Sequence, residues 1–430
     1  MAQATYSGLV SITLRKNTNK KSIKTIKGGR PVETSTSGSE LAPSVKVPLW
    51  YDPQVRALFF QALVIFGVLY GGYVLVSNTM DNLERQGIAS GFGFLNTTAG
   101  FAIGYSPFLE YSEENTYAQA FLVSLLNTLL VSFVGVILAT ILGFLLGVAR
   151  LSSNWLISKI AMVYVETLRN IPLLLQIFFW YFAVLRALPG PKNSTNIMDM
   201  FFINNRGLFT PAPVFNDGSG LIGIAIIAAI TIAYVIKKWA KKRQDDTGQT
   251  FPVLLTTLGL VFGLPLLAAA FMGFPISWEF SALKGFNFTG GTELPPEFVA
   301  LVLALSLYTA TFIAEIVRAG IMAVSHGQTE AAHALGVNNS NTLRLIVIPQ
   351  ALRVIIPPLT SQYLNLTKNS SLAAAIAYPD LVLVFDGTVL MQTGQAVEIV
   401  AITMAVYLTI SLLISAFMNW YNNKMALVER

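Results

Sequence analysis

The sequence predicts an all-α polytopic membrane protein with about eight transmembrane helices. Hydrophobic residues make up 54% of the 430 residues, and charged residues make up only 12%. A soluble globular protein carries about 25% charged residues, so water cannot be the main solvent of this chain. The apolar residues also gather into long uninterrupted segments, which is the pattern of helices that cross a lipid bilayer.

Eight apolar segments are long enough to cross a hydrocarbon core about 30 Å thick, which requires roughly 20 helical residues. Pro172, after Asn170, predicts a break in the third segment, and Pro379 with Asp380 interrupts the seventh. The eight segments lie near 57–77, 118–149, 157–187, 219–237, 253–273, 297–324, 358–385 and 397–421.

The distribution of lysine and arginine predicts the orientation. Short cytoplasmic loops carry an excess of positive charge, and the basic tail before the first segment places the N-terminus on that side. An even number of spans returns the C-terminus to it, so both termini are expected in the cytoplasm. Basic residues on the predicted cytoplasmic side include Arg150, Lys159, Lys237, Lys238, Lys241, Lys242, Arg243, Arg344, Arg353 and Lys424.

The cytoplasmic segment 318–358 is too polar to cross the membrane and too regular for a linker. Gln328–Leu335 is rich in helix-forming residues, and Gly336 follows as a left-handed C-cap. The polar residues 339–341 can cap a second helix, which Pro349 is expected to kink or end. On pattern alone, these features are also typical of an ordinary interfacial hairpin.

The spacing of certain residues in this segment indicates a specific function beyond that of an interfacial hairpin. Glu330, Ala331 and Ala332 are followed by Gly336 and then by Ile346 to Pro349. This arrangement resembles the EAA loop of ABC importer permeases, with Ile348 where the family has leucine. Further segments resemble the polar amino-acid permeases, and the enlarged chain is similar to the general L-amino-acid branch. These segments are Tyr164–Gln176, Ala314–Ile321, Gln350–Arg353 and Leu366–Leu372.

The resemblance implies a type I permease core in a bacterial inner membrane. The expected regions are a flexible tail 1–56, an extra span with an outer loop 57–117, a permease domain 118–421 with an insertion 188–296, and a cytoplasmic C-terminus 422–430. The implied partners are an ABC ATPase homodimer, a second permease that is a related chain or a second copy, a periplasmic binding protein and lipid. No nucleic-acid partner is expected.

The resemblance also implies roles for individual residues. Glu330 would offer a carboxylate to the ATPase, and Gly336 would set the turn between two helices. Ala331, Ala332, Ile346 and Pro349 would complete the coupling surface.

ATP would be bound by the partner, because the chain has no GxxxxGK[ST] phosphate loop, and no cofactor is expected. Two histidines and no cysteine argue against a metal site, and no catalytic set is expected.

Ionisable residues inside membrane spans are costly unless they are paired or hydrated. Glu166 with Arg169, and Glu315 with Arg318, are spaced to pair on one helix face. Lining of the substrate path is the alternative role for Glu166, Arg169 and Glu315. The polar group that interrupts the seventh span is a further candidate for the path, although packing between helices explains it equally well. It consists of Lys368, Asn369, Ser370 and Ser371.

Three other functions remain open at this point. An ABC permease could carry another small polar solute, because the sequence does not name the cargo. A stand-alone secondary transporter would show inverted repeats and functional charges at the midplane, and the sequence shows no convincing repeat. A non-transport scaffold or receptor would leave the segment 318–358 unexplained.

Overall fold

The computed structural model describes residues 53–85 and 91–425. Nearly all of the predicted basic tail therefore lies outside the described residues, as do the last five residues of the chain. The helical elements in chain order are α1 (Pro53–Arg85), η2 (Phe92–Asn96), α2 (Tyr117–Arg150), α3 (Trp155–Asn170), α4 (Leu173–Phe178), η3 (Phe179–Leu185), η4 (Pro191–Asn193), α5 (Gly220–Thr247), α6 (Val253–Phe271), α7 (Pro296–Met322), α8 (His326–Ala334), α9 (Asn339–Thr342), η5 (Leu343–Val347), α10 (Ile348–Asn369), η6 (Ser370–Ile376), η7 (Val382–Val389), α11 (Leu390–Thr393) and α12 (Ala396–Met425).

The helical polytopic fold is confirmed. Within the described residues, seven helices are long and apolar enough to cross a membrane, and a bent pair brings the number to eight. The bent pair joins α3 to α4 and η3 at an angle of 106°. The first part of α1, up to Leu75, is a unit of its own. Its large apolar side chains are exposed, as in a helix surrounded by lipid.

The predicted break at Pro172 is the bend between α3 and α4. Pro172 has no N–H, so it cannot donate to the carbonyl of Leu168, four residues earlier. The side chain of Gln176 replaces that donor: its Nε2 lies 2.8 Å from the Leu168 carbonyl oxygen and 3.0 Å from that of Ile171. One buried amide therefore satisfies two carbonyls that the break leaves without a backbone donor.

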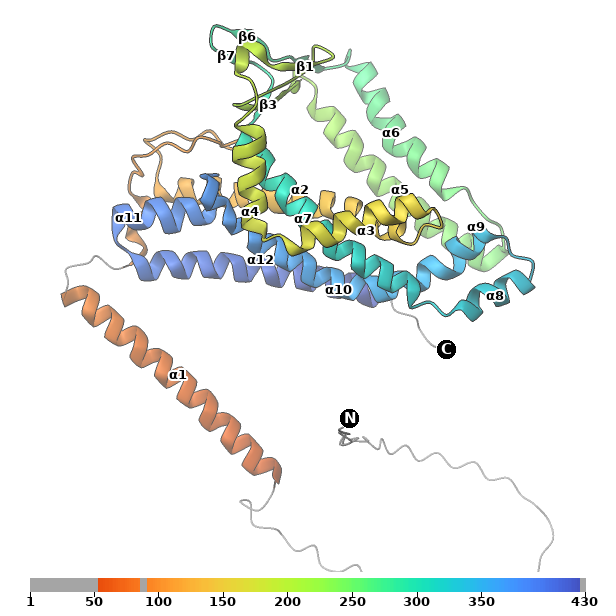
Figure 1. Cartoon of the computed structure of the whole chain (residues 1–430), viewed down its shortest axis with the longest axis horizontal. Helices are drawn as coiled ribbons and strands as arrows, with labels where there is room; N and C mark the ends of the chain where they lie inside the picture. The colour runs from red at the N-terminus through yellow and green to blue at the C-terminus, as the bar shows by residue number, and fades with distance from the viewer. Residues whose placement is uncertain (1–52, 86–90, 426–430) are drawn as a thin grey trace, which may run out of the picture. The chain divides into compact units, whose positions relative to one another are not determined.

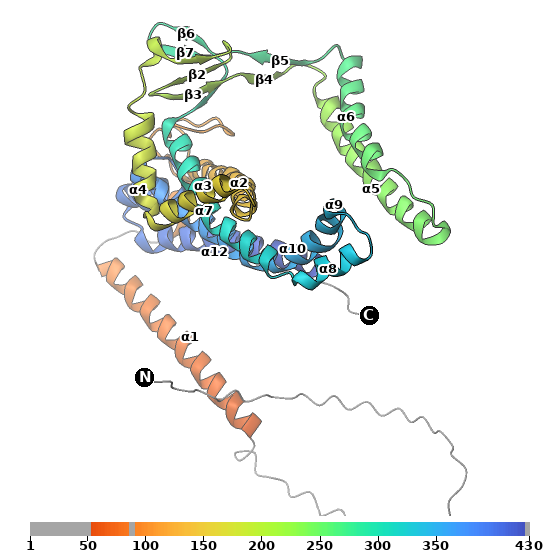
Figure 2. The same ribbon diagram turned by 45° about the vertical axis from the view of Figure 1, so that its right-hand side comes forward.

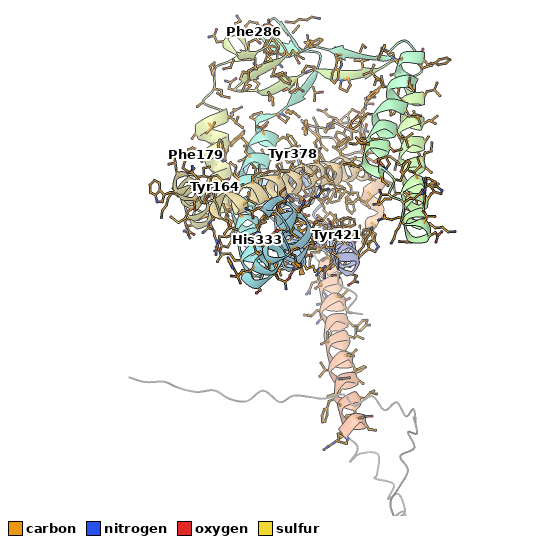
Figure 3. All side chains as sticks on the ribbon, turned by 90° about the vertical axis from the view of Figure 1, so that its right-hand side faces the viewer. Tyr164, Phe179, Phe286, His333, Tyr378 and Tyr421 are labelled. Atoms are coloured by element: carbon orange, nitrogen blue, oxygen red, sulfur yellow. The ribbon has the colours of Figure 1, made fainter. Side chains whose placement is uncertain are left out.

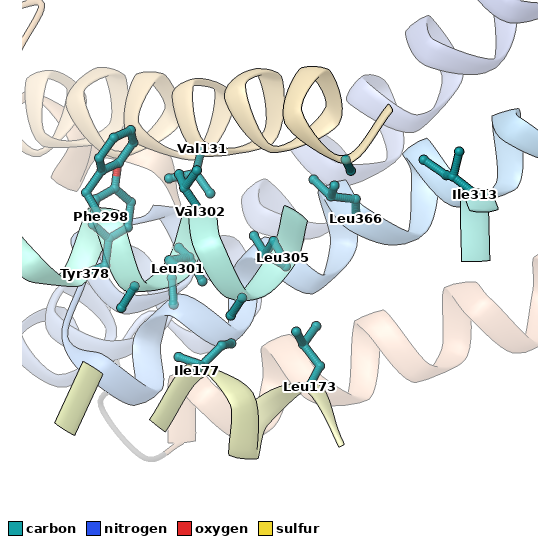
Figure 4. Close-up of a cluster of buried hydrophobic side chains, with 14 of the residues drawn as sticks. Val131, Leu173, Ile177, Phe298, Leu301, Val302, Leu305, Ile313, Leu366 and Tyr378 are labelled. Carbon is teal, nitrogen blue, oxygen red and sulfur yellow. The ribbon is translucent and has the colours of Figure 1, made fainter. Parts of the chain in front are cut away.

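Helices α2 and α7 pack together along their length and form the centre of the fold (Figure 1). Gly143 and Gly147 allow the close approach: a Cβ on Gly143 would lie 2.5 Å from Ile313, and one on Gly147 would lie 2.7 Å from the Ala314 carbonyl oxygen. The GxxxG pattern therefore acts as a helix contact. Figure 4 shows Leu301 and Leu305 of α7 in the buried cluster that this packing creates.

Helix α10 packs on both α7 and α12. The predicted seventh span begins earlier than expected, because the chain remains helical from Asn339 to Ile376. It stops at Ala377, which has a left-handed φ of 60°. Asp380 then starts the next helical element, since its Oδ1 accepts a hydrogen bond from Leu383 N at 2.9 Å. The predicted interruption at Pro379 and Asp380 is therefore a real break.

A small β layer that the sequence analysis did not predict lies at one end of the helices, where only an outer loop was expected (Figure 2). It forms a four-stranded antiparallel sheet in the order β1-β2-β3-β8 and two ribbons, β4-β5 and β6-β7. Strand β8 leads through Pro295 directly into α7. The strands are β1 (Thr195–Ile197), β2 (Phe201–Asn204), β3 (Gly207–Thr210), β4 (Ala212–Phe215), β5 (Ile276–Glu279), β6 (Ala282–Lys284), β7 (Asn287–Thr289) and β8 (Thr292–Leu294).

Aromatic packing holds this β layer together. The rings of Phe209 and Phe288 stack at 4.8 Å between centroids. At its edge, burial raises the pKa of the Glu293 carboxyl, while nearby Arg206 opposes the shift. The layer gives α7 a rigid attachment at its first turn.

The two inserted helices α5 and α6 pack on each other. Small residues of α5 (Ala225, Ala229 and Ala233) are buried at intervals of four, which is the spacing of one helix face. No residue of α6 is buried. The remaining apolar surface of the pair suits lipid contact.

Candidate functional site

The segment 318–358, called the EAA segment below, begins at the last turn of α7 and includes α8. Glu330 and Ala331 of α8 are exposed, whereas Ala332 is buried at 2% exposure. Glu330 Oε1 lies 3.1 Å from His326 Nδ1, and both side chains are largely open to solvent. The EAA residues therefore present one carboxylate and one small side chain outward, where a partner protein could contact them.

Gly336 ends α8 as the sequence predicted. Its φ is 74°, in the left-handed region that glycine adopts without strain. The N–H of Gly336 donates to the His333 carbonyl at 2.9 Å, and the N–H of Val337 donates to that of Ala332 at 3.0 Å. These two bonds form a Schellman motif, so the turn after α8 has a single defined geometry.

The N-cap of the second helix is Asn338, one residue before the predicted capping group, so the helix begins at Asn339 within that group. Asn338 Oδ1 accepts a hydrogen bond from Asn341 N at 2.9 Å. Pro349 does not end this helix, because the chain stays helical through it to Ile376. Pro349 follows the π-helical turn η5, at the second residue of α10. The preceding π-helical turn η5 absorbs the change in hydrogen bonding.

This continuity joins the EAA segment to the membrane domain. The chain stays helical from Asn339 to Ile376, through α9, the π-helical turn η5, α10 with Pro357 and Pro358 inside it, and η6. This continuous helical stretch, called the α10 rod below, links the EAA segment to α10 without an intervening loop. Ile346 and Pro349 are half-buried, and Val347 between them is buried. A groove of about 650 Å³ between α8, η5 and the end of α7 includes His333, which Figure 3 labels.

A cluster of charges lies near the same end of α7. Arg150 Nη1 binds Glu315 Oε2, and Arg150 Nη2 lies 3.8 Å from Glu166 Oε1. Arg318 Nε binds the other oxygen of Glu315 at 3.1 Å, which confirms the predicted pair on α7. Arg169 lies over the Phe312 ring, 5.1 Å from its centroid.

The sequence analysis did not connect Arg150 with these residues. Arg150 is the last residue of α2, and it reaches α3 and α7 rather than a residue of its own helix. Sequence spacing finds pairs within a helix, but it does not find partners on other helices.

The polar group of the seventh span divides into two sets. Ser370 is 1% exposed, and its hydroxyl donates to the Thr367 carbonyl at 2.7 Å. Asn369 is half-buried. Lys368 and Ser371 instead line a cavity of about 440 Å³. The other lining residues, which the sequence analysis missed, include Thr403, Tyr407 and Ser411 of α12.

Residues 294–427 match the family described as "Binding-protein-dependent transport system inner membrane component". This match covers α7, the EAA segment, the α10 rod and α12. The general L-amino acid transport system permease protein AapQ of Rhizobium johnstonii is 55% identical over 88% of this chain and 94% of its own length.

The chain is a permease of the amino-acid ABC transporter family. The putative amino-acid ABC transporter permease protein YhdX of Escherichia coli is 53% identical over 88% of this permease and 96% of its own length. The glutamate/glutamine/aspartate/asparagine transport system permease protein BztB of Rhodobacter capsulatus is 42% identical over 89% of this permease and 96% of its own length. As a member of this family, the permease is a multi-pass inner-membrane protein that works with an ATPase and a substrate-binding protein.

Proposed function

We propose that the EAA segment of this permease binds the cytoplasmic ATPase and transmits its movement to the membrane helices. The single observation that carries the proposal is the helical rod from Asn339 to Ile376, which starts beside α8 and ends in the membrane domain. The Schellman turn at Gly336 fixes the angle between α8 and this rod. A rigid turn transmits displacement, whereas a flexible loop would absorb it.

Glu330 and Ala331 are the proposed contacts with the ATPase. They are exposed on α8, and the small alanine side chain permits close approach of another surface. The permease itself supplies no ATP hydrolysis, because its sequence has no phosphate-binding loop of the GxxxxGK[ST] form. Hydrolysis belongs to the ATPase homodimer.

We further propose that this permease pairs with a related second permease and that both of its termini are cytoplasmic. The charge distribution of the loops supports the orientation. The inserted pair α5 and α6 supports a heterodimer, because it enlarges this chain beyond the compact five-helix pattern. The substrates are L-amino acids of several side-chain types, in line with the similarity to a general L-amino acid permease and to a permease for acidic and amide amino acids.

Lys368 and Ser371 are the proposed path residues, because they line the cavity with Thr403 and Tyr407. An ammonium group and hydroxyl groups are suitable donors for the α-carboxylate of an amino acid. Ser370 serves packing instead, because its side chain is buried and it is not among the residues that line the cavity.

The ATPase contact is tested by the double variant Glu330→Lys with Ala331→Leu. The variant reverses the exposed charge and adds bulk, so we expect the ATPase no longer to co-purify with the permease and amino-acid uptake to be lost. Asp246→Lys is the matched control, since it reverses an exposed carboxylate on α5, outside the EAA segment. Co-purification at the wild-type level with the double variant would contradict the proposal.

The substrate class is tested by measuring uptake of a panel of L-amino acids in a strain that lacks the gene. We expect reduced uptake of acidic, amide and neutral amino acids and restoration by the wild-type permease. Equal uptake of every amino acid with and without the gene would contradict the assignment and favour another small polar solute.

A further inference from the structure

One arginine joins α7 to two neighbouring helices beside the EAA segment. Arg150 ends α2, and its guanidinium binds Glu315 of α7 while lying 3.8 Å from Glu166 of α3. Its side chain is 12% exposed, whereas that of Glu166 is 58% exposed. Three helices therefore meet at a single, mostly buried cation.

Close packing of the backbones brings these groups together. A Cβ on Gly147 would lie 2.7 Å from the Ala314 carbonyl oxygen, so the backbones of α2 and α7 are in close contact at this level. Arg150 follows Gly147 by three residues, and Glu315 follows Ala314 directly. The Arg150 carbonyl also accepts a hydrogen bond from Ser158 Oγ at 2.9 Å, which holds the connection between α2 and α3.

Each member of the ion pair has an alternative partner. Glu315 presents Oε2 to Arg150 and Oε1 to Arg318, which belongs to α7 itself. If Arg150 left, Glu315 would remain bound by Arg318. Arg150 in turn has Glu166 within reach. Leaving a buried charge unpaired is the main cost of breaking an ion pair, and here neither charge would be left alone.

The pair also lies on a short route to the EAA segment. Only residues 323–325 separate the end of α7 from α8. On the other side of α7, a Cβ on Gly320 would collide with Ile355 of α10. A displacement of α8 and of the α10 rod therefore reaches the turn of α7 that carries Glu315.

We propose that Arg150 is a positioning residue of the transport cycle, which holds α2 to α7 through Glu315 in one state and transfers to Glu166 of α3 in the other. The transfer occurs when the EAA segment displaces the end of α7. This inference rests on the proposed coupling role of the EAA segment. It gives Glu166 and Glu315 a role in helix movement instead of substrate contact.

The test uses the complete transporter in proteoliposomes: this permease with its partner permease, the ATPase and the binding protein. Two quantities are measured, the amino acid transported per ATP hydrolysed and the ATPase rate without binding protein. For Arg150→Gln we expect the ATPase rate without binding protein to rise and transport per ATP to fall. Each change is expected to be about tenfold, the effect of one charge-assisted hydrogen bond on an equilibrium. The KM for the amino acid is expected to stay unchanged.

Three further variants sharpen the test. Arg150→Lys keeps the charge but loses the second N–H group of the guanidinium fork. We therefore expect a fall in transport per ATP that is smaller than the fall for Arg150→Gln. Glu166→Gln removes the second proposed partner and leaves the Arg150–Glu315 pair in place, so transport per ATP is expected to fall while the ATPase rate without binding protein stays at the wild-type value. Lys159→Gln, a change of an exposed cation on α3, is the matched control and is expected to behave as wild type.

Several results would overturn the inference. Unchanged transport per ATP with a lower yield of folded permease would mean a purely structural role for Arg150. A changed KM or amino-acid preference would mean substrate contact. Loss of ATPase co-purification with Arg150→Gln would place the residue in the docking surface. The Glu330 variant tests the coupling proposal separately, so unchanged coupling with Arg150→Gln would leave that proposal standing.

Discussion

At the sheet end of α7, Glu297 accepts a hydrogen bond from the neutral hydroxyl of Tyr181 at 2.7 Å, whereas near the EAA end Glu315 is bound by two arginines. The Arg186 guanidinium lies over the Tyr181 ring, 5.8 Å from its centroid. The first carboxylate has a single neutral partner, and the second has two charged partners on different helices.

The backbone differs at the two ends as well. Strand β8 pairs with β3 up to Leu294, and α7 starts two residues later, so the sheet end is attached to a hydrogen-bonded ladder. The EAA end continues through a short connection into an exposed helix. The comparison shows that α7 is attached to a hydrogen-bonded ladder at one end and to neighbouring helices through ion pairs at the other. Ion pairs can exchange partners, whereas a strand ladder cannot, so the proposed movement belongs to the EAA end.

A substitution that forces α2 away from α7 should cause the largest loss of stability. Gly147→Leu adds four heavy atoms where even a Cβ would overlap the Ala314 carbonyl, so we expect a loss of stability of about 3 kcal/mol, typical of a strongly overpacked core. The measurement is the midpoint of heat-induced loss of the permease peak in size-exclusion chromatography in detergent. Gly259→Leu on α6, which has open space around it, should leave the midpoint unchanged. Equal midpoints for both variants would refute the close approach.

Gly336→Asp should abolish ATP-driven uptake while the amount of permease in the membrane stays normal. The left-handed φ of 74° is strained for a side chain, and the new charge lies close to the proposed ATPase contact. Gly336→Asn has nearly the same shape without the charge and tolerates this φ better, so it should keep part of the uptake. Normal uptake by Gly336→Asp would count heavily against a coupling role for this turn.

A substitution at the sheet end of α7 should have the smallest effect on stability and on transport. Tyr181→Phe removes one neutral hydrogen bond to Glu297, so we expect a stability loss of about 1 kcal/mol. Transport per ATP should remain at the wild-type value, because the sheet ladder still anchors α7. A fall in this ratio as large as that for Arg150→Gln would show that the two ends of α7 do not differ in the proposed way.

The positions of the spans, the bend in the third span and the end of α8 could be predicted, because each depends on a local signal in the sequence. Span positions follow from uninterrupted apolar segments, the bend in the third span follows from Pro172, and the end of α8 follows from Gly336. Each of these residues acts through its own backbone chemistry, so its effect is readable without knowledge of its neighbours.

Other features depended on tertiary contacts. The strands of the β layer are three or four residues long, which is too short for a reliable alternating pattern. The continuation of the helix past Pro349 was not predicted with certainty, because the π-helical turn η5 that accommodates this proline has no sequence signal. Arg150 was missed as a partner of Glu315 because the two lie on different helices. The roles of the EAA residues and of Lys368 and Ser371 remain predictions.

The amide of Gln176 has a consequence for how the bent span can move. Both of its N–H groups are committed, one to Leu168 and one to Ile171. Straightening the bend or folding it further would strain at least one of these two hydrogen bonds, and leaving a carbonyl that is shielded from water unpaired costs about 1–3 kcal/mol. The two bonds therefore favour one angle between α3 and α4, so that the two helices turn together as one angled unit.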